Sequence, residues 1–166
     1  MSNNPTIDTI IYATDMGDHM RPVFRRAIHL AEHHQANIIM VHVMEPLTST
    51  GNAVVEAYLP KEQLEKFHHE GMQSVLERMH QRITSFCREE TGACPATGST
   101  LVSDIVVTHG RPSQVIPAQA IDKEADLIVM GTCSHRLLGH GLLGSTAQRV
   151  IQRSDVPVMV VPNCEK

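Results

Sequence analysis

Four glycines precede a serine and a threonine in the C-terminal part of the chain, in a pattern that could bind a phosphate group. A continuous apolar run over residues 127–130 is followed by Gly131, and three more glycines come before Ser145 and Thr146. The residues from 146 to 153 then show the apolar spacing of a helix. Peptide N–H groups at a helix N-terminus have no partner within the helix, and the helix dipole favours an anion there. The stretch that begins at Gly131 is therefore predicted to bind the phosphates of a nucleotide.

Asp15 is a second candidate for ligand binding, because it follows an apolar run that ends at Ala13 and Thr14. A carboxylate at this place can accept hydrogen bonds from ribose hydroxyls or help to hold Mg²⁺. Its alternative role is to cap a turn or a helix. Ser145 and Thr146 also have two roles open to them, since they can bind phosphate or cap the last helix.

The spacing of histidine and cysteine residues in the same stretch raises a metal site as an alternative to a phosphate site. Cys133, His135 and His140 lie close together in the sequence and could bind a soft metal ion. No orienting carboxylate accompanies them, so no metal site is predicted. His42, at the end of another apolar run, is expected to be a structural histidine whose ring has a hydrogen-bond partner.

The motifs of known hydrolases give no support for an enzyme. The sequence contains no G-x-S-x-G elbow, no Walker lysine motif and no H-E-x-x-H motif. Without a P-loop lysine or an evident general base, rapid turnover of ATP is not expected. We therefore predict no catalytic residues, and slow ATP hydrolysis stays open as an alternative.

The elements that must position these residues follow from the apolar periodicity, which predicts five strands alternating with four helices. The strands are expected at residues 7–13, 38–44, 101–108, 127–131 and 156–161, and the helices at about 18–34, 60–90, 113–124 and 146–153. This alternation is typical of an α/β domain with a doubly wound parallel sheet and helices on both faces.

A strand order of 3-2-1-4-5 would place the candidate residues together. In such a sheet the order reverses between the first and fourth strands, and ligands bind beyond the carboxyl ends at that reversal. Those ends are residues 13–15 and the pair Met130 and Gly131. We expect one domain over residues 1–166, with a flexible leader at 1–5 and a variable loop at 45–60.

Composition and charge exclude several classes of partner. The 166 residues carry a net charge of −4 and include three Phe, two Tyr and no Trp. An acidic chain with so few aromatic residues is not typical of nucleic-acid binding, and no apolar run is long enough to cross a bilayer. The four cysteines form no C-x-x-C pair and the N-terminus has no signal peptide, so a cytoplasmic protein with reduced thiols is expected.

From residue 7 to residue 161 the chain resembles the universal stress protein family. The family's nucleotide motif is a glycine, two residues, a second glycine, nine residues, and a glycine followed by serine or threonine. Gly131 opens it here, Thr132 and Cys133 follow, and Gly144 and Ser145 close it at the same spacing; the second glycine is replaced by Ser134. A glycine supplies positive φ or close approach to a ligand, whereas the hydroxyl of Ser134 can donate to a phosphate.

The resemblance implies an adenine nucleotide alpha hydrolase-like fold and a set of nucleotide-binding residues. It implies that Asp15 lies near the ribose and that the backbone around Val43 meets the adenine. The full set of predicted binding residues is Ala13, Thr14, Asp15, Val43, Met130, Gly131, Cys133, Ser134, Gly144, Ser145 and Thr146. The ligand implied is ATP or a related adenine nucleotide, with Mg²⁺ as an optional companion.

The last strand predicts a second copy of the chain as a partner. Residues 156–161 are apolar on both alternating sets, and a bare edge strand of this kind tends to aggregate. Pairing with a symmetry-related copy would cover it, and the resemblance implies the same homodimer. The main hypothesis is thus a dimeric stress-response protein regulated by an adenine nucleotide. The alternative is the same fold without nucleotide, acting as an interaction or scaffold protein.

Overall fold

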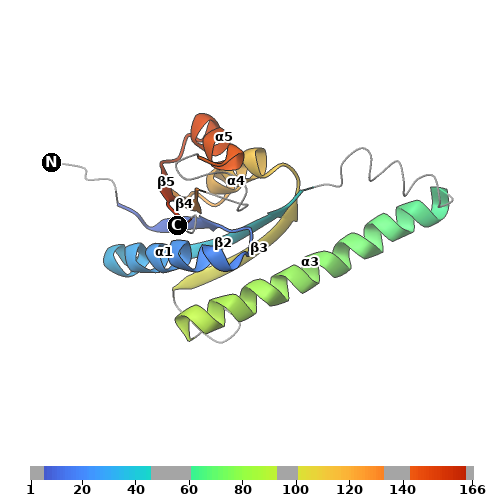
Figure 1. Ribbon diagram of the computed structural model, residues 1–166, viewed down its shortest axis with the longest axis horizontal. Helices are drawn as coiled ribbons and strands as arrows, with labels where there is room; N and C mark the ends of the chain where they lie inside the picture. Colours follow the sequence, from blue (N-terminus) through green and yellow to red (C-terminus); the bar gives the residue numbers. More distant parts are fainter. Residues whose placement is uncertain (1–5, 46–60, 93–100, 133–142, 164–166) are drawn as a thin grey trace.

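The computed structural model describes residues 6–45, 61–92, 101–132 and 143–163 (Figure 1). Five parallel strands form one sheet, and their order is β3-β2-β1-β4-β5, as the sequence predicted. The strands are β1 (Thr9–Ala13), β2 (Asn37–Met44), β3 (Val102–His109), β4 (Leu127–Gly131) and β5 (Val158–Val161). The predicted leader at 1–5 and all but the first residue of the variable loop at 45–60 lie outside the described residues.

Helices cover both faces of the sheet, which confirms the predicted doubly wound α/β architecture. They are the 3₁₀ helix η1 (Asp18–Met20), α1 (Arg21–His34), α3 (Lys61–Thr91), α4 (Pro112–Asp122) and α5 (Ser145–Arg153). Figure 1 shows α1 and α3 on one face of the sheet, with α4 and α5 on the other. No helix within the described ranges has the length and apolar character needed to span a bilayer.

The buried side chains of the strands alternate between two apolar clusters, one on each face of the sheet. Along β1, Ile10 and Tyr12 join the cluster beneath α1 and α3, whereas Ile11 and Ala13 join the cluster beneath α4 and α5. The first cluster contains aromatic rings in contact, with 4.8 Å between the centroids of the mutually tilted rings of Tyr12 and Phe24. Because both of their faces are buried, the central strands β1, β2 and β4 read as largely apolar runs, and this made them recognisable in the sequence.

Two strands begin two residues later than predicted because side chains bond the backbone there. The first strand begins at Thr9 rather than residue 7, since the N–H groups of Asp8 and Thr9 both donate to Oδ2 of Asp126. The last strand begins at Val158 rather than residue 156. Oγ of Ser154 bonds the carbonyl and the N–H of Val156 and forms a turn before the strand.

Ion pairs join the start of α1, which lies next to the carboxyl ends of the strands, to the end of α3. Arg21 and Arg25 both donate to the Glu90 carboxylate, at 2.5 and 2.8 Å, and that carboxylate is only 5% exposed. Burial raises the pKa of Glu90, but the hydrogen bonds and charges of the two guanidinium groups outweigh it. The pKa therefore lies below its ordinary value. These pairs fix α1 in the position from which it supports the neighbouring turn.

Candidate functional site

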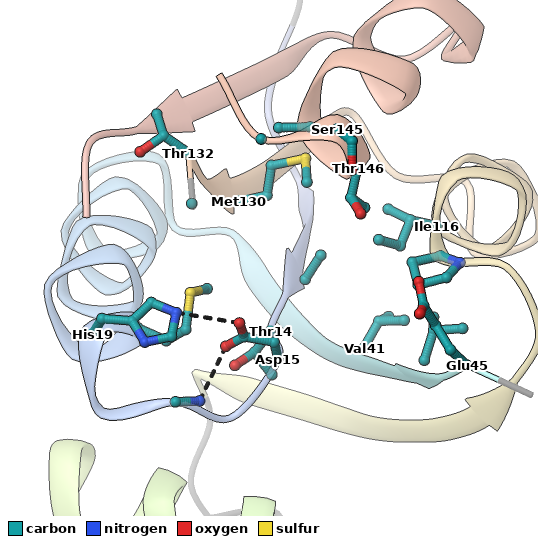
Figure 2. Close-up of a pocket in the computed structure, with 18 residues that line it drawn as sticks. Thr14, Asp15, His19, Val41, Glu45, Ile116, Met130, Thr132, Ser145 and Thr146 are labelled. Carbon is teal, nitrogen blue, oxygen red and sulfur yellow. Dashed lines mark hydrogen bonds and ion pairs between the residues drawn. The ribbon is translucent and has the colours of Figure 1, made fainter. Parts of the chain in front are cut away.

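A cleft of about 560 Å³ opens at the carboxyl ends of β1 and β4, where the strand order reverses (Figure 2). Nine of the residues predicted from the sequence line it: Ala13, Thr14, Asp15, Val43, Met130, Gly131, Gly144, Ser145 and Thr146. The other two, Cys133 and Ser134, lie outside the described residues, as do His135 and His140 of the metal-binding alternative. Nucleotide binding by these residues stays a prediction, but the fold does bring the nine together.

Nine further lining residues were not predicted from the sequence. They are Gly17, His19, Met20, Val41, Glu45, Pro112, Ile116, Thr132 and Ala147. Val41 and Ile116 add apolar side chains to the lining of the cleft. The sequence signals that could have predicted them are the buried strand that contains Val41 and the sheet-facing side of the helix that contains Ile116. His19 belongs to a turn whose form has no periodic signal.

One end of the cleft is formed by the N-terminus of α5. Gly144 takes the N-cap position with no side-chain hydrogen bond to the helix, so of the two roles open to Ser145 and Thr146, capping is not the one found. These two residues occupy the first two helical positions instead, where peptide N–H groups have no partner within the helix. In Figure 2 the side chain of Thr146 extends into the cleft. This end of the cleft can donate hydrogen bonds to an anion.

Backbone hydrogen bonds at Thr132 join this helix start to the end of β4. The N–H of Gly144 donates to the Thr132 carbonyl at 2.7 Å, and the N–H of Thr132 donates to the carbonyl of Val161 at 3.1 Å. The start of α5 is thus fixed to the two neighbouring strands β4 and β5. Its free peptide groups keep one orientation relative to the sheet.

Asn163, just after β5, is a buried residue that supports the same corner. Its Oδ1 accepts from the Thr132 hydroxyl at 3.1 Å, and its Nδ2 donates to Sδ of Met20 at 3.3 Å. A Cβ at Gly131 would lie 2.7 Å from Cγ of Asn163. Gly131 does not have positive φ in this structure. The position requires a glycine for another reason, which is that the Asn163 side chain occupies the space a Cβ would need.

Buried apolar side chains also line the cleft. Ala13, Val41, Ile116 and Met130 are all at most 5% exposed, and they come from β1, β2, α4 and β4. A slot of this kind suits a flat heteroaromatic ring, because its apolar faces leave water on binding.

A hydrogen bond from the buried His42 ring to the Thr14 carbonyl fixes the neighbouring strand ends. Nδ1 of His42 lies 2.8 Å from that oxygen, which confirms the predicted structural histidine. The N–H of Thr14 also donates to the Val41 carbonyl at 3.0 Å, so β1 and β2 stay paired up to the edge of the cleft.

Asp15 lies in a tight turn at the mouth of the cleft. Its Oδ1 accepts the N–H of Gly17 at 3.0 Å, and its Oδ2 lies 3.1 Å from Nε2 of His19. The alternative role of Asp15, capping a turn, is therefore present, and its ligand role stays a prediction. Across the described ranges, no three His, Cys, Asp or Glu side chains gather as metal ligands.

Tyr12 fixes the short helix η1 that carries His19. Its hydroxyl donates to the Met20 carbonyl at 3.2 Å from a fully buried position. Burial, the largest influence, raises the pKa of Tyr12 far above its ordinary value, so the phenol stays neutral and continues to donate.

Comparison with known proteins identifies the relatives of this chain. The sequence profile of the Universal stress protein family matches residues 6–162. A universal stress protein of Thermus aquaticus is 34% identical over 153 residues, which cover 92% of this chain and 97% of that protein. Universal stress protein YxiE of Bacillus subtilis is 26% identical over the same length, with the same coverage.

Solved structures share the fold. Protein MJ0577, from Methanocaldococcus jannaschii, superposes with a TM-score of 0.73 at 23% identity, covering 97% of this chain and 99% of that one. A universal stress protein crystallised in complex with cAMP superposes with a TM-score of 0.53 at 22% identity, covering 95% and 98%.

The packing of Gly131 against Asn163 predicts a non-additive pair of substitutions. Gly131→Ala alone should destabilise the protein by about 1–3 kcal/mol, because the added methyl overlaps the amide. In an Asn163→Ala background, the same change should cost less than about 0.5 kcal/mol, since the overlapping group is gone. Denaturant unfolding of the four proteins measures this coupling. An equal penalty for Gly131→Ala in both backgrounds would contradict the assignment.

Proposed function

The chain belongs to the universal stress protein family, and from this premise we propose that it binds ATP or a related adenine nucleotide as a regulatory ligand. The proposal places this activity in the cytoplasm, in a stress response. The observation that carries it is the uncapped N-terminus of α5, which lines a cleft that also has a buried apolar wall.

The cleft fits a nucleotide in size and in the distribution of its chemistry. Its volume of about 560 Å³ falls within the range of about 300–1,000 Å³ usual for small-molecule sites. The apolar slot formed by Val41, Ile116 and Met130 would take the base, and the start of α5 would take the phosphates. The cAMP complex of a universal stress protein with this fold supports an adenine ligand.

Each predicted residue has a place in this arrangement. Asp15 and Val43 would hold the nucleoside, with Ala13, Thr14 and Met130 forming the wall around it. The phosphates would bind Gly131, Gly144, Ser145 and Thr146, together with Cys133 and Ser134 from the adjoining segment.

Mg²⁺ fits this site only as an ion carried by the phosphates. Asp15 and Glu45 are the described carboxylates that line the cleft, and both oxygens of Asp15 already interact with groups of its own turn. Protein sites commonly hold Mg²⁺ through one or two carboxylates together with substrate phosphates.

One observation favours a second candidate, a scaffold protein without nucleotide. Ser134 stands where the family motif has glycine, and a Cβ there would obstruct a phosphate if the backbone has to approach it closely. Calorimetric titration with millimolar ATP and Mg²⁺ separates the two. Heat of binding supports the nucleotide site, and its absence, with no adenine nucleotide released from the denatured protein, supports the scaffold.

Thr146→Glu tests the phosphate end of the cleft without harming the fold. The first turn of α5 has no acidic residue, and a carboxylate there stabilises a helix by about 0.3–1 kcal/mol. The same charge repels a polyphosphate, so we expect ATP affinity to fall about tenfold or more while the melting temperature is kept. Adenosine, which lacks phosphates, should lose little affinity.

Gln148→Glu is the matched control, because it adds the same charge to an exposed position of α5 outside the cleft. It should leave ATP affinity within about twofold of the wild type. Equal affinities for ATP in Thr146→Glu and the wild type would contradict the proposed phosphate site.

We further propose a homodimer formed through β5, which is an edge strand of the sheet. The carbonyls of Pro157 and Val161 accept hydrogen bonds from β4. Since strand backbone groups alternate in direction, those of Val158 and Val160 face the open edge. A second copy could pair there and cover the half-buried valines.

Val160→Pro should convert this dimer into a monomer. Proline removes an N–H group that faces the open edge. It breaks no hydrogen bond to β4, so the monomer should keep its fold. Light scattering coupled to gel filtration measures the mass, and circular dichroism checks the fold. A wild-type protein with the mass of one chain would contradict the dimer.

A further inference from the structure

The turn that connects β1 to α1 contains a contact between a histidine and an aspartate at the mouth of the cleft. Nε2 of His19 lies 3.1 Å from Oδ2 of Asp15, and the two side chains are 27% and 34% exposed. An ionised carboxylate can only accept a hydrogen bond, so Nε2 of His19 carries the hydrogen. Both side chains line the cleft (Figure 2).

The other carboxylate oxygen of Asp15 is held from the same turn. Oδ1 accepts the N–H of Gly17 at 3.0 Å. A carboxylate has about four acceptor positions on its two oxygens, so about two stay available for a ligand. Two hydrogen bonds from one side fix the rotation of the group, and a fixed acceptor loses less entropy when a ligand binds.

The position of the His19 ring depends on the backbone around it. Gly17 has no Cβ, and a Cβ there would overlap Cε1 and Nδ1 of the ring. Met16 adopts a left-handed backbone with φ of 68°, which lets the chain turn back. The N–H of Met20 then donates to the Gly17 carbonyl at 2.9 Å and closes the turn. The ring is thus supported by a fixed frame.

We propose that His19 is a positioning residue, which holds the Asp15 carboxylate as a preformed acceptor for the paired hydroxyls of the ligand's sugar. The inference rests on the proposed nucleotide site and adds to it the residue that positions Asp15. A ribose presents two adjacent hydroxyl donors, which match the two oxygens of one carboxylate. Asp15 then contributes affinity through the sugar and not through a metal ion.

The test compares ATP with 2′,3′-dideoxy-ATP by calorimetry on the full chain. The wild type should bind ATP about tenfold more tightly than the dideoxy compound, since two hydrogen bonds to a charged acceptor are lost. In His19→Ala this ratio should fall to about threefold or less, with the affinity for the dideoxy compound unchanged. Both ratios should be the same in EDTA as in Mg²⁺.

Two further variants separate positioning from a general structural effect. His19→Gln keeps an N–H donor of similar reach and should restore most of the ratio. Gly17→Ala displaces the ring while His19 is kept, and it should lower the ratio as His19→Ala does. His29→Ala changes an exposed histidine of α1 outside the cleft and should leave the ratio at the wild-type value.

Three results would overturn the proposal while nucleotide binding itself stands. One is an equal loss of affinity for ATP and for the dideoxy compound in His19→Ala. Another is a ratio of the two affinities that does not change in that variant. The third is a ratio that exists only in the presence of Mg²⁺, which would assign Asp15 to a metal ion. Absence of binding of both nucleotides to the wild type would instead reject the proposed function, and this inference with it.

Discussion

The peptide N–H groups at the start of α5 have no partner within the helix, and the rest of the candidate site depends on where they point. They face the cleft because the Thr132 carbonyl accepts the N–H of Gly144, which ties the helix start to the end of β4. Unsatisfied donors together with the helix dipole favour an anion at this place. Buried apolar residues of β1 and β2 line the same cleft, and the proposed ligand accordingly has one anionic and one apolar part.

Three elements distant in sequence are joined through the side chains of Asn163 and Tyr12, which do not line the cleft. Asn163 connects Thr132 to Met20, and the Tyr12 hydroxyl donates to the Met20 carbonyl. The end of β5, the end of β4 and the helix η1 are therefore linked across the corner of the cleft. A change at Asn163 would act on the phosphate end and on the Asp15 turn together, although it lies in neither.

The fold could be predicted because strands buried on both faces and helices with one apolar face have distinct periodicities. The residues at the strand ends were predictable for the same reason, since Gly131 ends one strand and Asp15 lies just beyond another, and the order of these strands was inferred. His19 and Asn163 were not. His19 reaches Asp15 only because Met16 is left-handed and Gly17 lacks a side chain, and Asn163 contacts a residue 143 positions away. Neither geometry leaves a periodic signal in the sequence.

The most direct measurement of the central claim is the ¹⁵N-edited NMR spectrum of the wild-type protein, titrated with ATP and separately with adenosine. The account predicts that the amide resonances of Ser145, Thr146 and Ala147 shift strongly with ATP and much less with adenosine. Resonances of Val41 and Ile116 should shift with both ligands. Binding of ATP that leaves the three amide resonances of α5 unmoved would contradict it.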